Sequence, residues 1–552
     1  MPDDPGAARN GTGASDEALP ASRQHDTART DKPSSAASPV PASGKGSTTS
    51  QPVTSPAKAG KTPPSAGSST SATLPTLPAI NPRLPLPDTF PPQRAACLTP
   101  TRIAELRQQH QQAREQRIER FRIDQRVGLL MRGLADDTDR TLRQLWTEAA
   151  MPADWTLFAV GGYGRGELQP HSDVDLLLLG PEEGPTTEAI PAIECFIGAC
   201  WDIGLEIGHS VRSPSECAEE AGAEISTMTA LLERRLLIGS RRTARLLTGA
   251  MAGRLQLPMF LRDKLLEMRQ RHHKFEDTPY SLEPNCKESP GALRDLQVIS
   301  WISHAAGLGR SWGALVQAGV IEPLEARQLQ RHERLLKRIR AWLHILAGRR
   351  EDRLIFDLQP SVASAMNFRG DGPRACSEKL MRAYYLAAKA ITQLSTLLVQ
   401  SLEIRILHPN PGPALPIDEH FDQIDDKLDL RDPDEFERDP RLILQAFRTL
   451  QLQRSLNGMT VRTLRALWHA RFQIDARYRR DPVNRACFLS ILQTPEGITH
   501  TLRLMNQWSV LGRYLVPFWR IVGRMQHDLF HVYTVDQHTL MVIRNLRRFM
   551  MA

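Results

Sequence analysis

The chain has 552 residues, more than one ordinary hydrophobic core can accommodate, so several domains are expected. Hydrophobic residues make up 41% and charged residues 24%, a composition typical of a globular protein and not of a fibrous or wholly disordered one. The net charge of +8 is a mild excess for this length, and without an RNP motif, a zinc finger or a concentrated basic helix it gives no reason to expect nucleic-acid binding.

The first 95 residues predict a disordered tail. Residues 1–95 are dominated by Ser, Thr, Ala, Pro and Gly and offer almost nothing to bury. At Leu98 a stretch rich in helix-forming residues begins, with Thr99 or Thr101 as a candidate helix cap. We therefore expect a domain over residues 96–250 that opens with a helix.

Short buried strands and then many helices are predicted in chain order. LFAVGGYGRGEL and SDVDLLLLG predict strands around a glycine turn, PTTEAIPAIECFIGACWDIG predicts a helix, and LEIGHSVR predicts another strand. Almost every later segment has a helical pattern, with a break at HPNPGPALP that separates a helical domain at 251–407 from a second helical region at 408–520. The expected fold class is α+β, with a small mixed sheet followed by a mostly helical region.

The sequence shows no signal for insertion into a membrane or for secretion. No apolar run approaches the length needed to span a membrane, and the N-terminus MPDDPGAARN lacks an apolar signal core. The seven cysteines form no CxxC pair and suggest neither a zinc ribbon nor a disulfide framework. We expect a cytoplasmic protein that does not bind membranes.

The residues that carry chemistry are two aspartates ahead of a buried strand. In the segment Ser172-Asp173-Val174-Asp175-Leu176, the side chains of Asp173 and Asp175 point to one face, because alternate residues of a strand do so. Two carboxylates so close repel each other unless a cation lies between them, and hard oxygen ligands suit Mg²⁺. A lone DxD is most often a solvated strand edge, but here it follows GGYGRGEL, and the joined pattern predicts a nucleotide-transfer site.

Nearby residues are candidates for binding the nucleotide. Gly161 and Gly162 allow the backbone to approach a triphosphate, and Arg165 and Ser172 could add a charge-assisted and a hydroxyl contact. A third carboxylate for a two-metal site is expected from a neighbouring strand.

Glu206, between two apolar residues, is the preferred candidate for this third carboxylate, with Asp202 as its competitor. In the alternative interpretation, Glu206 is an ordinary strand carboxylate paired with Arg212.

The joined motif resembles the DNA polymerase β-type nucleotidyltransferase superfamily, and three later segments resemble PII uridylyltransferases. These are EPNCKESPGALRDL (283–296), RLIFD (353–357) and QHDLFHVYTVDQHT (526–539). The resemblance implies transfer of UMP from UTP to a tyrosine of the nitrogen-signalling protein PII, with Mg²⁺ at Asp173 and Asp175. The family also removes UMP through an HD-type metal phosphohydrolase domain and senses glutamine through two ACT domains.

The end of the sequence departs from this family. Residues 521–552 resemble only the start of an HD domain, with His538 matching its first metal-binding histidine, and His527-Asp528 precedes it where the family's pair follows. One histidine cannot hold the metals of such a site. We therefore expect that the removing activity and glutamine control are missing from this chain.

Two rival functions remain open at this stage. An adenylyltransferase of glutamine synthetase shares the superfamily site, although the EPN-K and YTVDQHT segments argue against it. A noncatalytic regulator that binds PII or nucleotide, or an inactive fragment, is the other alternative. Lys287, Arg294 and Asp295 either form structural salt bridges between the catalytic and helical domains, which is the preferred interpretation, or contact the nucleotide. His272 and His273 are expected to lie on the surface.

Overall fold

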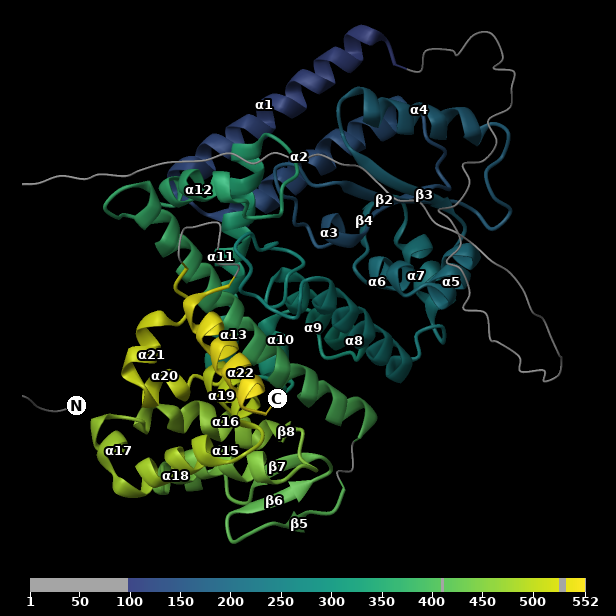
Figure 1. Ribbon diagram of the computed structural model, residues 1–552. Coiled ribbons are helices and arrows are strands. Elements are labelled where there is room, and N and C mark those ends of the chain that lie inside the picture. Colours follow the sequence, from purple (N-terminus) through teal and green to yellow (C-terminus); the bar gives the residue numbers. More distant parts are fainter. Residues whose placement is uncertain (1–97, 409–411, 526–532, 552) are drawn as a thin grey trace, which may run out of the picture. The chain divides into compact units, whose positions relative to one another are not determined.

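The computed structural model describes residues 98–408, 412–525 and 533–551, so the predicted tail at 1–95 lies outside the described residues. All described residues fall in one unit, Phe90–Ala552. The fold is α+β, as the sequence predicts, with a mixed sheet near the start and a mostly helical remainder (Figure 1).

Two long helices open the described part of the chain. They are α1 (Pro100–Asp124), capped by the Thr99 hydroxyl, which accepts a hydrogen bond from the Arg102 N–H at 3.2 Å, and α2 (Val127–Glu148). Gln125 separates them because its positive φ of 57° ends the first helix. Trp146 of α2 packs on Phe196 of α4 (Ala189–Asp202), with ring centroids 5.3 Å apart.

The first sheet positions the predicted aspartates. Its order is β3-β2-β1-β4, with β1 antiparallel to β2 and β4 and β2 parallel to β3. The strands are β1 (Thr156–Ala159), β2 (Val174–Leu179), β3 (Ile207–Arg212) and β4 (Arg235–Ile238). All of β2 is buried except Asp175, so the strand fixes this carboxylate at the edge of the core. The remaining helices of this part are α3 (Gly161–Gly164), α5 (Pro214–Ala223), α6 (Ile225–Leu232) and α7 (Arg241–Met251).

A helical region follows, in which two long helices pack on each other. They are α11 (Pro323–Ala347) and α13 (Pro373–Leu407), with α9 (Leu293–Ala305) against both. These helices carry buried aromatic side chains that join them to other segments: Trp342 of α11 packs on Phe121 of α1, and Tyr385 of α13 packs on Tyr280, with ring centroids 5.3 and 5.9 Å apart. The other elements are α8 (Leu257–Lys274), α10 (Trp312–Gln317), the 3₁₀ helix η1 (Phe356–Leu358) and α12 (Gln359–Ala365).

The predicted second helical region contains a sheet that the sequence pattern did not reveal. The strands β5 (Leu415–Pro416), β6 (Phe421–Ile424), β7 (Lys427–Leu430) and β8 (Gly458–Met459) are only two to four residues long. Runs this short show no alternation distinguishable from a loop, so the sequence pattern, which indicates helices for almost all of this region, does not reveal the sheet. The helices that pack with this sheet or follow it are α14 (Glu435–Arg438), α15 (Leu442–Leu452), α16 (Val461–Ala470), η2 (Arg471–Gln473), α17 (Ala476–Arg480), α18 (Pro482–Gln493), α19 (Ile498–Gln507) and α20 (Leu511–Tyr514).

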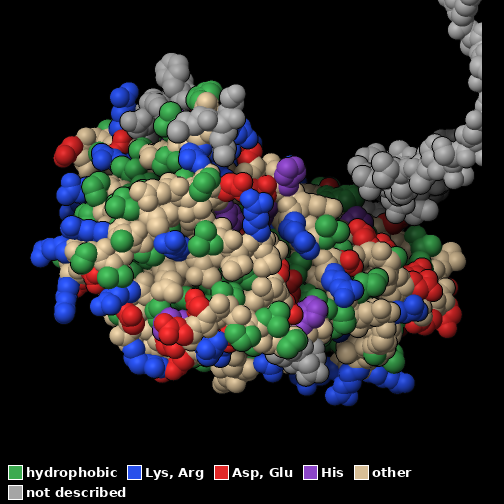
Figure 2. All heavy atoms as spheres, turned by 60° about the horizontal axis from the view of Figure 1, so that its bottom comes forward, with side chains coloured by type: hydrophobic (Ala, Val, Ile, Leu, Met, Phe, Trp, Pro, Cys, Tyr) green, Lys and Arg blue, Asp and Glu red, His purple; other side chains and the backbone are tan. Residues whose placement is uncertain are grey.

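The last described elements are α21 (Val516–Ile521) and α22 (Val535–Met551). The buried Asp536 side chain joins them to the rest by accepting hydrogen bonds from the Gly523 N–H and the Asn506 amide, both at 3.0 Å. Among the helices that the structure describes, none is both long and apolar enough to cross a bilayer. On the face drawn in Figure 2, Lys and Arg side chains are interspersed with Asp and Glu side chains.

Candidate active site

The Asp175 carboxylate lies between two glycines. Gly161 begins α3 directly after β1, with a φ of +55°, and a Cβ atom there would lie 2.9 Å from Asp175 Oδ2. Gly208 on β3 is the register partner of Asp175, and a Cβ atom there would lie 2.9 Å from Oδ1. A side chain at either position would displace the carboxylate, which explains the first glycine of the GG turn, Gly161, in physical terms.

The two aspartates interact electrostatically across the start of β2. Burial and the neighbouring Asp173 charge raise the pKa of Asp175, while the positive charges of Lys287, Arg350 and Arg165 act in the opposite direction. Asp173 is more exposed and forms an ion pair with Arg350. The negative charge of Asp175 is therefore costly in this structure unless a further cation lies nearby.

The carboxylate pair has the chemistry of a Mg²⁺ site. Mg²⁺ prefers hard oxygen ligands and is commonly held by one or two carboxylates together with substrate phosphates, so Asp173 and Asp175 fit it. The space between the two glycines holds the Asp175 carboxylate in one place, as a ligand requires. Within the described residues, no group of three His, Cys, Asp or Glu side chains could hold a metal ion by itself.

Glu206, the predicted third carboxylate, lies beside this pair but lines a different cavity. Its carbonyl accepts a hydrogen bond from the Val174 N–H at 2.9 Å, one register step from Asp175. Its exposed side chain borders a small cavity shared with Arg114 and His171. Arg212 pairs instead with Glu220 at 2.6 Å, so the alternative interpretation with a Glu206–Arg212 pair was wrong.

The competitor Asp202 is the last residue of α4, where its carbonyl accepts hydrogen bonds from the Arg107 guanidinium. The identity of a third ligand therefore stays a prediction. His538, the other predicted metal ligand, is exposed on α22. His527 and Asp528 lie outside the described residues.

Arg165 and Ser172 both line the cavity in front of the aspartates. The Arg165 guanidinium is paired with Glu233 at 2.6 Å and with Glu167 at 3.4 Å. Burial alone would lower the Arg165 pKa, but these two carboxylates hold it above its ordinary value. Arg165 is thus a charged but already partnered group, which fits a role in fixing the glycine turn.

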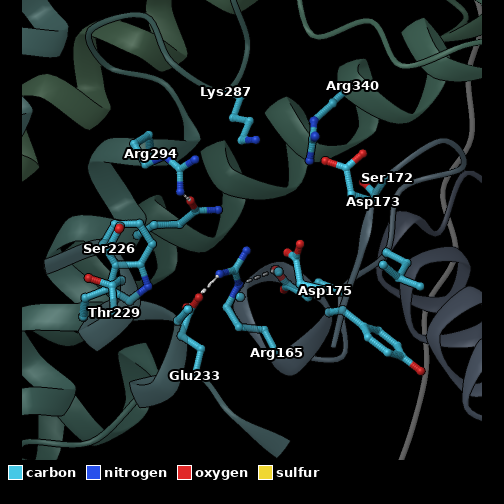
Figure 3. Close-up of a pocket in the computed structure, with 18 of the residues that line it drawn as sticks. Arg165, Ser172, Asp173, Asp175, Ser226, Thr229, Glu233, Lys287, Arg294 and Arg340 are labelled. Carbon is cyan, nitrogen blue, oxygen red and sulfur yellow. Dashed lines mark hydrogen bonds and ion pairs between the residues drawn. The ribbon is translucent and has the colours of Figure 1, made fainter. Parts of the chain in front are cut away.

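The opposite wall of this cavity comes from the helical region (Figure 3). The cavity has a volume of about 300 Å³. Gly161, Gly162, Ser172, Asp173 and Asp175 line one side. The helical region contributes Lys264, Glu267, Lys287, Arg294, Gln297, Trp301, Arg340 and Arg350. Five side chains of that wall are Lys or Arg; Lys264 is paired with Glu267 at 2.5 Å, and the other four, Lys287, Arg294, Arg340 and Arg350, suit an anionic substrate.

Two residues of this wall, Lys287 and Arg294, and the buried Asp295 behind it were expected from the sequence to form structural salt bridges. Arg294 pairs with Glu288 at 3.0 Å, as predicted, but it also lines the cavity together with Lys287. Asp295 is fully structural: it is buried and accepts hydrogen bonds from Arg271 at 2.6 Å and His272 at 2.9 Å. The prediction that His272 is a surface residue was therefore wrong, because its partner lies on α9, far along the chain.

No local sequence pattern marks Arg340 or Arg350 as residues of the cavity wall. Arg340 lies on α11 and is held by Asp352, whose carboxylate also accepts a hydrogen bond from His344 at 3.2 Å. Arg350 follows α11 and reaches the first domain only through tertiary packing. Arginines on a basic helix and its loop look like surface residues until the fold is known.

The chain matches three family profiles in succession. Residues 140–217 match the "Nucleotidyltransferase domain" family, residues 259–399 match "GlnD PII-uridylyltransferase", and residues 421–514 match "Uridylyltransferase GlnD third domain". Asp173 and Asp175 lie in the first match, and Lys287, Arg294, Arg340 and Arg350 lie in the second.

Curated relatives give a consistent result. The chain is 52% identical over 446 residues to a bifunctional uridylyltransferase/uridylyl-removing enzyme of Bordetella parapertussis, covering 81% of this chain and 51% of that protein. It is 54% identical over 424 residues to the protein of the same name from Ralstonia nicotianae, covering 77% and 49%. The chain spans about half the length of the curated relatives it matches. With the resemblance confirmed by profile and by relatives, the chain belongs to the GlnD PII-uridylyltransferase family.

Proposed function

We propose that this chain transfers UMP from UTP to a tyrosine hydroxyl of PII, with release of pyrophosphate. The observation that carries the proposal is the Asp173 and Asp175 pair, with Asp175 held between Gly161 and Gly208, facing a cationic wall across a cavity. A pair of neighbouring carboxylates, of which the partly buried Asp175 has a raised pKa, is costly without a cation, and such a pair is what metal-assisted nucleotidyl transfer needs.

The chain's own residues would perform binding and orientation. Gly161 and Gly162 bring backbone close to the triphosphate, and Ser172 adds a hydroxyl beside it. Asp173 and Asp175 would hold Mg²⁺, which when bound stabilises the charge on the transferring phosphoryl group. The tyrosine oxygen then forms a bond to the α-phosphorus, and the bond from that phosphorus to the bridging oxygen of pyrophosphate breaks.

The choice of UTP and PII rests on the family. The family that matches residues 259–399 is the GlnD PII-uridylyltransferase family, and the relatives are named uridylyltransferases. This supports uridylyl transfer over the rival adenylyl transfer to glutamine synthetase. We propose uridylyl transfer alone, and we place the reaction in the cytoplasm. The proposed domain boundaries are at about residues 250 and 407, between the matched segments.

Label transfer from α-labelled UTP to purified PII in Mg²⁺ tests the proposal. The wild type should label PII, and the Asp173→Asn/Asp175→Asn variant should not. Asp154→Asn/Asp371→Asn, which changes two exposed aspartates away from the cavity, should label PII like the wild type.

Any of three results would overturn the proposal. A folded wild type that labels no PII would leave the regulator or the inactive fragment. Equal labelling by the double aspartate variant would place the chemistry elsewhere. Unlabelled ATP that competes as well as unlabelled UTP would favour the adenylyltransferase.

A further inference from the structure

The loop after α8 carries Lys287 into the cavity. Asn285 fixes the loop, because its side-chain oxygen accepts hydrogen bonds from the N–H groups of Lys287 at 2.9 Å and Glu288 at 2.8 Å. The Lys287 carbonyl accepts from the Arg294 N–H at 2.8 Å, at the start of α9. The backbone of Lys287 is therefore held from both sides, and Figure 3 shows its side chain pointing into the cavity from the wall opposite Arg165.

Lys287 differs from its cationic neighbours in how it is partnered. Arg294 has Glu288 at 3.0 Å, and Arg340 has Asp352, which accepts two hydrogen bonds from it. Among the described residues, the carboxylate within 4 Å of the Lys287 ammonium is that of Glu288 alone, at 3.9 Å, and Arg294 already engages it. Lys287 thus contributes a positive charge without a close anionic partner.

The surroundings of Lys287 favour the arrival of an anion. The side chain is largely buried, and burial together with the charges of Arg294 and Arg340 lowers the pKa of its ammonium group. Converging cations repel one another, and an anion bound among them removes that cost. A polyphosphate supplies several oxygens to such a group of donors at once.

The place of the Lys287 ammonium group in the cavity determines which phosphates of a nucleoside triphosphate it would contact. Asp173 and Asp175 lie on the other side of the cavity and would face the reacting α-phosphate. Because Lys287 lies across the cavity from them, its ammonium group is placed for the part of a triphosphate that extends away from the carboxylates.

We propose that Lys287 binds the β- and γ-phosphates of UTP, the part of the substrate that leaves as pyrophosphate, and acts as a positioning residue for transfer. The assignment rests on the proposed function. In the reaction the tyrosine hydroxyl releases its proton to solvent as its oxygen forms a bond to the α-phosphorus, the bond between the α-phosphorus and the bridging oxygen breaks, and the electron pair stays on pyrophosphate. The Lys287 ammonium stabilises that charge without giving up its proton.

Binding measured in the absence of PII tests this assignment independently of transfer. Isothermal titration of the full chain with UTP, UMP and inorganic pyrophosphate, each with Mg²⁺, compares wild type with Lys287→Met, Lys287→Arg and Lys274→Met. Lys274 is an exposed lysine at the end of α8 and serves as the matched control.

Loss of one charge-assisted contact should raise the Kd of Lys287→Met for UTP and pyrophosphate about tenfold, and leave its Kd for UMP within about twofold of wild type. Lys287→Arg should retain part of the UTP affinity, and Lys274→Met all of it. An unchanged UTP affinity in Lys287→Met, or equal loss for UTP and UMP, would overturn the assignment. If UTP binding depends on Lys287 while wild type labels no PII, the proposed function and the positioning role in transfer both fail, and only the binding of the β- and γ-phosphates by Lys287 stands.

Discussion

The Asp173 carboxylate forms an ion pair with the Arg350 guanidinium, which lies 177 positions further along the chain. The contact joins the start of β2 to the loop after α11. The positive charge of Arg350 also acts on Asp175, whose pKa it lowers against the larger raising effects of burial and Asp173. Arg350 therefore belongs to the electrostatics of both aspartates.

Replacing Arg350 by Gln should move the acid limb of the transfer pH profile to higher pH. Without this charge the Asp175 pKa rises further, and since the carboxylates must be ionised to hold a cation, activity is lost at a higher pH as acid is added. The measurement is kcat/KM for PII labelling against pH. Arg349→Gln, which removes a neighbouring arginine paired with Glu351 at 3.0 Å, should leave the acid limb in place. A shift to lower pH in Arg350→Gln would contradict the expectation.

Gly208→Ala should reduce transfer far more than it reduces stability. The new Cβ atom would lie 2.9 Å from Asp175 Oδ1, so the carboxylate must move, and displacement of a ligand by a fraction of an ångström to an ångström can cost about 100-fold in rate. Gly198→Ala on α4 is the control, because its Cβ atom would meet nothing within 4 Å. The measurements are the PII labelling rates and the melting temperatures of both variants. Equal labelling rates for Gly208→Ala and Gly198→Ala would show that transfer does not need the space that Gly208 leaves for the Asp175 carboxylate.

Asp175→Asn should make the protein without ligand more stable at neutral pH. The folded-state pKa of Asp175 lies above its unfolded value, so ionisation disfavours the folded state, and the wild type loses stability as pH rises through that interval. The variant has no such charge, and its advantage should vanish in acid, where the wild-type carboxyl is protonated. Thermal melts over pH measure this. Added Mg²⁺ should stabilise the wild type more than the variant, and a variant less stable than wild type at neutral pH would contradict the argument.

Asp352→Asn should destabilise the fold by about 3 kcal/mol, because it removes one partner of a largely buried ion pair. Burial alone would raise the Asp352 pKa, but hydrogen bonds from His344 and Arg340 hold it well below its usual value. This stabilisation is present above the unfolded pKa and is lost as pH falls towards the folded one, so wild type and variant should converge in acid.

Urea unfolding at neutral and acid pH measures the effect of Asp352→Asn. The control Glu496→Gln breaks an exposed pair with Arg454 and should cost less than about 1 kcal/mol. Equal unfolding free energies for wild type and Asp352→Asn at neutral pH would show that Asp352 does not anchor Arg340.

The glycine turn and the aspartate pair on the first domain's side of the cavity were predictable from sequence, whereas Glu233 and the residues of α6 that also line it were not. Gly161, Gly162, Asp173 and Asp175 lie within a short stretch, and the spacing of residues along a strand already places both carboxylates on one face. The α+β class and the order of the first strands follow from the same local patterns.

The other half depends on contacts between distant segments. Nothing near Arg340 or Arg350 in the chain shows that the end of α11 faces β2, and Gly208 looks like an ordinary strand glycine until its register with Asp175 is known. The short strands β5 to β8 escaped detection because two to four residues show no period. Glu206 satisfied the local pattern for a third ligand, yet its side chain borders a neighbouring cavity.

The ion pair between Glu167 and Lys337 limits how this protein can be recombined with its relatives. Glu167 belongs to the glycine-turn motif, and its carboxylate lies 2.5 Å from the ammonium group of Lys337 on α11. A chimera that imports the turn from another enzyme without an acid at this position would leave Lys337 with Glu333 alone, and Arg165 with Glu233 alone. A turn without an acid at position 167 should therefore be exchanged together with α11. The two segments depend on each other although 170 positions separate Glu167 from Lys337.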